Sequence, residues 1–164
     1  MWWITGPAGA GKSTLGRRLA DRLRAGGRPT VFLDGDSLRE TLFPRAGYDP
    51  DERLELARRY AGLCGLLSDQ GHEVVCATIS LFPEIWQANR GRFAVYREVL
   101  VQAPLEVRAR RKPALYHPGG TVGPVVGRDG PLPEPPDPHV RVINDGTRTP
   151  DELVDEILAH EVRP

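Results

Sequence analysis

The residues from Gly6 to Ser13 read Gly-Pro-Ala-Gly-Ala-Gly-Lys-Ser, which is a complete phosphate-binding loop of the type GxxxxGK[ST]. In such a loop the glycines allow backbone N–H groups to turn inward around a triphosphate. Lys12 places a positive charge against the β- and γ-phosphates, and the hydroxyl of Ser13 is a ligand for Mg²⁺. The motif therefore predicts a site for a nucleoside triphosphate. The residues expected to contact it are Gly6, Ala8, Gly9, Ala10, Gly11, Lys12, Ser13 and Thr14.

The place of this loop in the chain argues against the alternative, a glycine-rich turn without a ligand. The loop follows a short apolar run at residues 1–5 and precedes a helical pattern that begins near Ser13. A strand, a loop and a helix in this order bind phosphate well, because the positive end of the helix dipole points at the anion.

A second cluster of chemical groups contains Asp34, Asp36 and Arg39, at the end of the second expected strand. Ligands of parallel α/β sheets bind beyond the carboxyl ends of the strands. There, two carboxylates can hold Mg²⁺ through water or accept the proton of an attacking hydroxyl, and an arginine can bind an anionic acceptor. One of the carboxylates can instead cap the following helix, and the two roles do not exclude each other.

The elements that must position these groups alternate between short β-branched runs and longer helical patterns. Together with the phosphate-binding loop, this alternation predicts a single P-loop domain over 1–164, a three-layer α/β/α sandwich around a parallel sheet of about five strands; the family resemblance given below implies that it is a kinase domain. We expect strands at 2–5, 30–33, 73–79, 97–101 and 139–144. We expect helices at 13–24, after 36, and at 50–70, 83–93, 105–111 and 150–160.

The segment 112–139 interrupts the alternation, because it is too rich in proline and glycine for a helix or an inner strand. Long irregular loops in compact domains are usually lids or disordered segments, so a lid is expected here and a flexible segment is the alternative. Arg108, Arg110 and Arg111 precede it. Arg108 and Arg111 are predicted to clamp the triphosphate when the lid closes; the alternative is a solvated basic helix face.

The composition limits the possible partners. The chain has 164 residues and equal numbers of basic and acidic side chains, 22 each, so no overall charge attracts nucleic acid or an anionic membrane. No stretch approaches the roughly 20 apolar residues of a membrane span, and residues 1–5 do not resemble a signal peptide, so we expect neither. Cys64 and Cys76 lack metal-ligand spacing and lie in apolar segments. We expect both to be buried, reduced thiols of a cytoplasmic protein.

Taken together, these motifs resemble the adenylylsulfate kinase family, whose members phosphorylate the 3′-hydroxyl of adenosine 5′-phosphosulfate with MgATP. The resemblance covers nearly the whole chain. It rests on segments 3–6 and 11–14, Leu-Asp-Gly-Asp at 33–36 with Arg39, Gly47-Tyr48 with Arg53, Arg58 and Arg59, 77–80, 104–107, and Gly127, Asp129 and 134–136 of the expected lid.

The resemblance implies roles for the residues around the acceptor. Asp36 is the implied base or hydroxyl-orienting group, Arg39 and Arg53 bind the anionic mixed anhydride, and Tyr48 stacks on the acceptor base. Ser80 falls where some members carry a serine that can be phosphorylated, and it can alternatively cap the next helix. The implied substrate-binding residues are Asp34, Asp36, Arg39, Tyr48, Arg53, Ile79 and Ser80, and the catalytic set is Lys12, Asp36 and Ser80. ATP and Mg²⁺ are the implied cofactors, and a homodimer is possible.

Several positions depart from the family pattern. Leu56 stands where the family has an asparagine, and Val125 or Val126 replaces an aromatic residue of the lid. The family's Asp-Pro-Lys-Gly-Leu-Tyr segment is reduced to residues 112–116, so its lysine has no clear counterpart. Residues 79–85, together with Asn89-Arg90, resemble a branch linked to surface polysaccharide modification. One activity in that branch is phosphorylation of cytidine diphosphoramidate, which is the alternative acceptor.

Other functions remain as alternatives. A GTP-binding switch carries Asn-Lys-x-Asp and Asp-x-x-Gly motifs, and neither occurs in this sequence. A kinase of sugars or shikimate-like acids has a similar fold and aspartate cluster, and substrate profiling would distinguish it. An inactive family member is the last alternative, because the segment at 112–116 is shortened.

Overall fold

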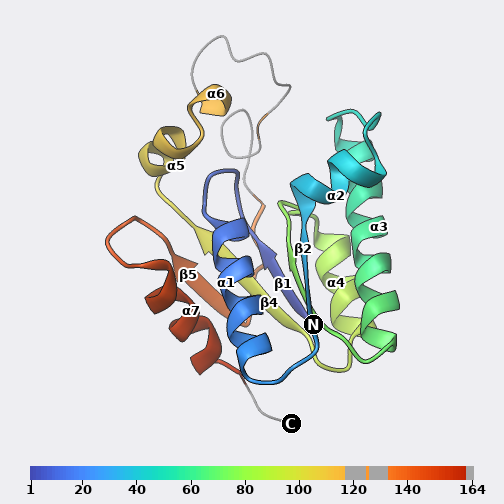
Figure 1. Cartoon of the computed structure of the whole chain (residues 1–164). Coiled ribbons are helices and arrows are strands. Elements are labelled where there is room, and N and C mark those ends of the chain that lie inside the picture. The colour runs from blue at the N-terminus through green and yellow to red at the C-terminus, as the bar shows by residue number, and fades with distance from the viewer. Residues whose placement is uncertain (117–124, 126–132, 162–164) are drawn as a thin grey trace.

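The computed structural model describes residues 1–116, 125 and 133–161. Its centre is a sheet of five strands in the order β2-β3-β1-β4-β5, and each neighbouring pair is parallel. The strands are β1 (Trp2–Thr5), β2 (Thr30–Asp34), β3 (Glu73–Ala77), β4 (Arg97–Gln102) and β5 (Val140–Ile143). Helices cover both faces of the sheet (Figure 1), so the predicted three-layer α/β/α sandwich is confirmed.

The two helical layers differ in composition. Helices α1 and α7 lie on one face of the sheet, and α3 and α4 lie on the other (Figure 1). The short helices α2, α5 and α6 lie near the end of the molecule where the strands end (Figure 1). The helices are α1 (Lys12–Ala25), α2 (Gly35–Leu42), α3 (Pro50–Asp69), α4 (Pro83–Arg92), α5 (Leu105–Arg111), α6 (Pro113–Tyr116) and α7 (Pro150–Ala159).

The alternation of side chains along β1 divides the core in two. Trp2 and Ile4 are fully buried in the cluster that contains Leu19 of α1, whereas Trp3 is buried in the cluster that contains Cys64 of α3. Successive side chains of a strand point to opposite faces of a sheet, so a run of consecutive apolar residues is what a doubly covered strand requires. The apolar start of the chain therefore joins both helical layers.

Local signals fix where the main helices begin. The carboxylate of Asp49 accepts a hydrogen bond from the backbone N–H of Glu52 (3.0 Å) at the start of α3. Thr149 and Glu152 form a capping box at the start of α7, in which each side chain accepts from the other residue's backbone N–H. Such caps satisfy N–H groups that the first turn leaves without partners. These helices begin where the sequence predicts.

Two elements differ from the sequence-based expectation. Strand β3 ends at Ala77 and not at Ile79, because the backbone N–H of Thr78 donates to the carbonyl of Ile4 (2.9 Å) on the central strand and the chain then leaves the sheet. Within the expected lid, residues 113–116 form the short helix α6, since Pro113 can begin a helix that it could not continue.

Two further expectations concern the interior and membranes. Cys64 and Cys76 are both buried free thiols, as predicted. Within the part of the chain that the structure describes, no helix combines the length and the apolar character needed to cross a membrane.

Gly6 lies at a position where a larger residue does not fit the observed backbone. Its φ of +141° is in a region that side chains disfavour, and a β-carbon there would lie 2.1 Å from the carbonyl oxygen of Val101. We expect Gly6→Ala to lower the free energy of unfolding by about 2 kcal/mol or more. Gly62→Ala is the matched control, because nothing lies within 4 Å of a β-carbon at that helical position.

Urea unfolding of both variants measures this difference. Gly62→Ala should raise the free energy of unfolding by about 0.5–1 kcal/mol through helix propensity. Equal stability of the Gly6→Ala variant and the wild-type protein would contradict the close packing of the loop against β4.

Candidate active site

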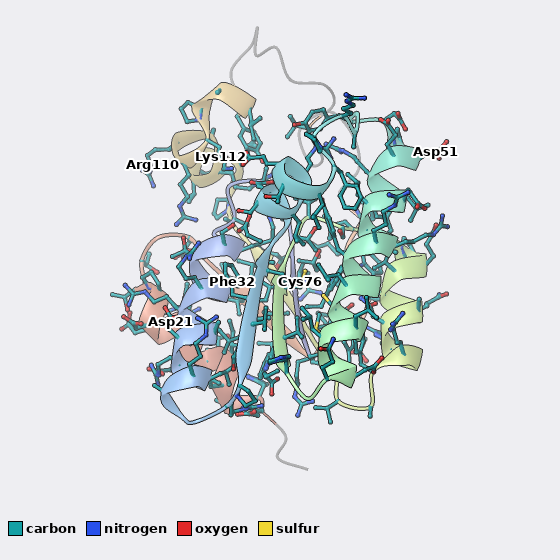
Figure 2. All side chains as sticks on the ribbon, turned by 45° about the vertical axis from the view of Figure 1, so that its right-hand side comes forward. Asp21, Phe32, Asp51, Cys76, Arg110 and Lys112 are labelled. Atoms are coloured by element: carbon teal, nitrogen blue, oxygen red, sulfur yellow. The ribbon has the colours of Figure 1, made fainter. Side chains whose placement is uncertain are left out.

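A cavity of about 740 Å³ opens beyond the carboxyl ends of the central strands. The phosphate-binding loop forms one side, and α2 with the first half of α3 forms the other. Residues 77–82 form its floor, and Lys112, Leu115, Val125 and Pro133 of the expected lid also line it. Figure 2 shows Lys112 close to the start of α2. Segments distant in the sequence therefore meet at one site, as expected for ligand binding in a parallel α/β sheet.

The phosphate-binding loop has the backbone of an anion site. Gly9 and Gly11 have positive φ values of 76° and 101°, and Gly11 caps the start of α1. Lys12 is 9% exposed, lines the cavity and donates from Nζ to the carbonyl of Pro7 at 2.8 Å. Burial lowers the pKa of Lys12 to about 8. A buried ammonium that faces a cavity is stabilised by an anion, so these residues fit the phosphates of a nucleotide.

A set of side chains that the sequence analysis did not select supports this loop. The Asn144 side chain donates to the carbonyl of Ala10 (2.8 Å) and accepts from Arg111 (2.9 Å). The Tyr116 hydroxyl donates to the carbonyl of Ala8 (2.8 Å). These bonds connect the loop carbonyls to side chains from the end of β5 and from α6. The position of Asn144 directly after β5 could have indicated its role, because all parallel strands end at the same edge.

The two arginines predicted to clamp the triphosphate contact other groups. Arg108 is 7% exposed, donates to the carbonyl of Ala103 (3.1 Å) and to the hydroxyl of Tyr116 (3.0 Å), and does not line the cavity. Arg111 donates to the carbonyls of Gly9 and Ala10. Both arginines therefore support the loop from outside the cavity, and their contact with a nucleotide stays a prediction.

The start of α2 separates the roles of the two aspartates. Asp34 is the N-cap of α2, and its Oδ1 accepts from the backbone N–H groups of Asp36 (3.0 Å) and Ser37 (3.3 Å). The carboxylate of Asp36 does not cap the helix. Its side chain is 73% exposed and lies 3.5 Å from Nζ of Lys112, on the cavity wall. One carboxylate caps and the other faces the cavity, which is the combination that the sequence left open.

The far end of the cavity carries two cations on one aromatic ring. The guanidinium carbon of Arg39 lies 4.0 Å from the centroid of Tyr48, and that of Arg53 lies 5.9 Å from it. Burial, and then the charge of Arg39, lower the pKa of Arg53 below its ordinary value. Two adjacent guanidinium groups repel each other, so an anion between them would be favourable.

Ser80 does not cap a helix. The N-cap of α4 is Phe82, and the buried hydroxyl of Ser80 lies 2.8 Å from Oγ1 of Thr78. Leu56, Leu81 and Val125 are at least 94% buried apolar residues on the same cavity. The Thr78 and Ser80 hydroxyl groups therefore lie in a cavity whose lining includes these apolar side chains.

The predicted site residues fall into two groups. The first group lines the cavity and contains Ala8, Gly9, Gly11, Lys12, Ser13, Asp34, Asp36, Arg39, Tyr48, Arg53, Ile79 and Ser80. The second group does not line it and contains Gly6, Ala10, Thr14, Arg108 and Arg111. Of the lid residues named from the sequence, Val126, Gly127 and Asp129 lie outside the described residues.

The residues present fit a magnesium ion that is bound together with phosphate. Among the described residues, no group of three or more His, Cys, Asp or Glu side chains could hold a metal ion. Ser13, Asp34 and Asp36 line the cavity near the phosphate-binding loop. Mg²⁺ usually takes one or two protein ligands, several waters and substrate phosphates, so a protein-only cage is not required.

The lowered pKa of Lys12 predicts a pH dependence of stability. The folded chain loses this proton near pH 8, and the unfolded chain near the ordinary value of 10.5. Since the unfolded state binds more protons between these values, the Lys12 contribution makes unfolding less favourable as the pH rises, by about 3 kcal/mol at most. Lys12→Met has no charge to bury and should lack this rise.

Urea unfolding without nucleotide at pH 7, 8.5 and 10 tests this expectation. The stability of Lys12→Met relative to wild type should decrease over this pH series. The exposed Lys112→Met is the control and should run parallel to wild type. A constant difference between Lys12→Met and wild type across the series would show that the buried ammonium is not penalised.

Comparisons with known proteins agree with this geometry. The structure of the Mycobacterium tuberculosis APS kinase CysC in complex with AMPPNP and APS superposes with a TM-score of 0.87 at 31% identity, covering 97% of this chain and 95% of that one. The probable adenylyl-sulfate kinase of Pyrococcus abyssi (strain GE5 / Orsay) is 38% identical over 160 residues, 95% of this chain and 91% of the relative.

A relative with a different acceptor is also similar. The cytidine diphosphoramidate kinase of Campylobacter jejuni subsp. jejuni serotype O:2 is 38% identical over 115 residues, which are 70% of this chain and 67% of that protein. The family model described as adenylylsulphate kinase matches residues 1–143. Because this match covers most of the chain and both relatives share more than a third of the aligned residues, the chain belongs to the adenylylsulphate kinase family.

Proposed function

We propose that this chain transfers the γ-phosphoryl group of MgATP to the 3′-hydroxyl of adenosine 5′-phosphosulfate, giving the 3′-phosphorylated nucleotide and ADP. One observation carries the proposal: a single cavity is lined by Lys12 of the phosphate-binding loop, by Asp36, and by Arg39 and Arg53 at the far end. A donor site, a base and an anion site are thus adjacent. The similarity to a kinase bound to AMPPNP and APS supports the same two substrates.

The donor half of the site acts through charge and alignment. Phosphoryl transfer requires little covalent chemistry from the protein, so positioning and neutralisation supply most of the catalysis. The backbone N–H groups of residues 9–13 and the ammonium of Lys12 bind the β- and γ-phosphates. When bound, Mg²⁺ neutralises charge on these phosphates, and the Ser13 hydroxyl is the group that holds it. The lowered pKa of Lys12 returns toward its ordinary value when the phosphates pair with it.

The acceptor half of the site orients one hydroxyl group. Asp36 accepts the proton of the 3′-hydroxyl as its oxygen forms a bond to the γ-phosphorus, and the bond from that phosphorus to the β-phosphate oxygen breaks, releasing ADP. Lys112, 3.5 Å from Asp36, adds positive charge at the point where the phosphoryl group passes. Arg39 and Arg53 bind the phosphosulfate, and Tyr48 contacts the base.

Cytidine diphosphoramidate is a second candidate acceptor, favoured by the apolar wall of the cavity. Leu56 is 5% exposed and Val125 is 6% exposed, and both line the cavity. By the family resemblance, Leu56 replaces an asparagine that contacts the acceptor, and Val125 or Val126 replaces the lid aromatic that stacks on the acceptor base. A pyrimidine is smaller than a purine and depends less on a second stacking surface. The mixed anhydride and the ribose hydroxyl are common to both nucleotides, so the rest of the site serves either.

Self-association and location remain proposals that rest on the family resemblance and the composition. We infer a homodimer from the family resemblance. We infer a cytoplasmic, reducing environment because Cys64 and Cys76 are buried free thiols.

We expect Asp36→Asn to lower the rate of phosphoryl transfer by at least about 100-fold, because general-base catalysis contributes roughly 10²- to 10⁴-fold. ATP binding and thermal stability should not change, since the side chain is 73% exposed and Asp34 caps the helix. The matched control is Asp51→Asn, an exposed carboxylate in the first turn of α3 outside the cavity. Turnover of the folded Asp36→Asn variant near the wild-type rate would remove Asp36 from the mechanism.

Parallel assays of the two acceptors test the proposed function directly. MgATP-dependent ADP release is measured with adenosine 5′-phosphosulfate and with cytidine diphosphoramidate, and mass spectrometry identifies each product. We expect kcat/KM to be at least about tenfold higher for the phosphosulfate, a difference of about 1.4 kcal/mol in transition-state binding. A preference of the same size for the phosphoramidate would assign the second candidate instead.

A further inference from the structure

Thr78 lies at the centre of the cavity floor, and the proposed mechanism gives it no role. It is 6% exposed, lines the cavity and follows the last residue of β3. Its backbone N–H donates to the carbonyl of Ile4 (2.9 Å), and the hydroxyl of Thr5 donates to the carbonyl of Ile79 (2.6 Å). These bonds attach the 78–80 segment to the end of β1, directly before the phosphate-binding loop.

The hydroxyl groups of Thr78 and Ser80 form a pair that can donate one further hydrogen bond. Their oxygens lie 2.8 Å apart, and either can be the donor. Each hydroxyl has one proton, and their mutual hydrogen bond uses only one of the two. No other hydrogen bond of either hydroxyl is found in the described part of the chain, and both residues line the cavity. The second O–H group can therefore donate to an oxygen of a bound ligand.

Contacts around Gly35 place this pair beside the proposed base. A β-carbon built on Gly35 would lie 3.0 Å from Oγ1 of Thr78 and 3.2 Å from the carbonyl oxygen of Ala77. The first residue of α2 is thus packed against the Thr78 side chain, and Asp36 is the next residue of that helix. Asp36, Thr78 and Ser80 line the same cavity, so one ligand can contact the carboxylate and the hydroxyl pair together.

We propose that Thr78 is a positioning residue for the acceptor nucleotide, which holds the Ser80 hydroxyl so that the pair donates one hydrogen bond to an acceptor oxygen beside Asp36. The inference rests on the proposed function, because it assumes that the acceptor occupies this half of the cavity. The ATP half does not take part, since the pair belongs to the floor beneath α2.

The test is a double-mutant cycle of Thr78→Val and Ser80→Ala. The KM for the acceptor is measured at saturating ATP, and the KM for ATP is measured at saturating acceptor. Thr78→Val keeps the shape and removes the hydroxyl, whereas Thr78→Ser keeps the hydroxyl. Thr41→Val, on the exposed part of α2 outside the cavity, is the matched control for a threonine-to-valine change. Thermal melting of each variant reports any loss of fold.

We expect Thr78→Val and Ser80→Ala each to raise the KM for the acceptor by about 3- to 10-fold, the range for one lost hydrogen bond, with the KM for ATP changed less than about twofold. The double variant should be no worse than the poorer single variant, because the pair acts as a unit. Thr78→Ser should recover most of the loss.

Three results would overturn the inference. These are multiplicative effects in the double variant, an equal rise in the KM for ATP, or a Thr78→Ser variant as impaired as Thr78→Val. If the wild-type protein phosphorylates neither nucleotide, the proposed function itself fails. Wild-type turnover with unaffected variants would instead reject only the role of Thr78.

Discussion

The hydrogen-bond ladders on the two sides of β1 determine where every functional group of this chain lies. Trp3 pairs with Cys76 of β3 on one side and with Glu98 of β4 on the other. Parallel pairing fixes the direction as well as the neighbour, so the loops after β1, β2 and β3 all open at the same edge of the sheet. The phosphate-binding loop, α2 with Asp36 and the 78–80 segment are those three connections. A change of register would separate them.

The phosphate-binding loop contains a buried ammonium, and several of the loop carbonyl groups accept hydrogen bonds from side chains. A buried ammonium is unfavourable without an anion, and burial lowers its pKa to about 8. Asn144 and Tyr116 donate to the loop carbonyls of Ala10 and Ala8. Because these two bonds use loop carbonyl groups, they do not compete with the phosphates for the loop N–H groups. The supporting bonds come from β5 and from the base of the expected lid, so the donor half of the site is shared by distant parts of the chain.

The acceptor half is assembled differently, from a polar edge and an apolar floor. Arg39 and Arg53 lie near Tyr48 at the edge, and apolar side chains such as Leu56 of α3 and Leu81 of the floor line the rest. The two arginines attract an anionic group whichever base carries it, and the apolar walls discriminate only weakly between bases. This division explains why the reaction type follows from the family more firmly than the identity of the base does.

Much of this protein is determined by local sequence. The alternation of apolar runs and amphipathic segments is sufficient for the five-stranded parallel fold, and residues 6–13 specify the phosphate-binding loop by themselves, because both signals depend on neighbouring residues. The motif around Asp34 and Asp36 locates the acceptor half in the same way. Only the tertiary structure decided that Asp34 caps α2 while Asp36 faces the cavity, that Arg108 donates to Ala103 and Tyr116, and that Asn144 supports the loop. Each of these outcomes depends on how the side chains are placed in three dimensions, which no local pattern encodes.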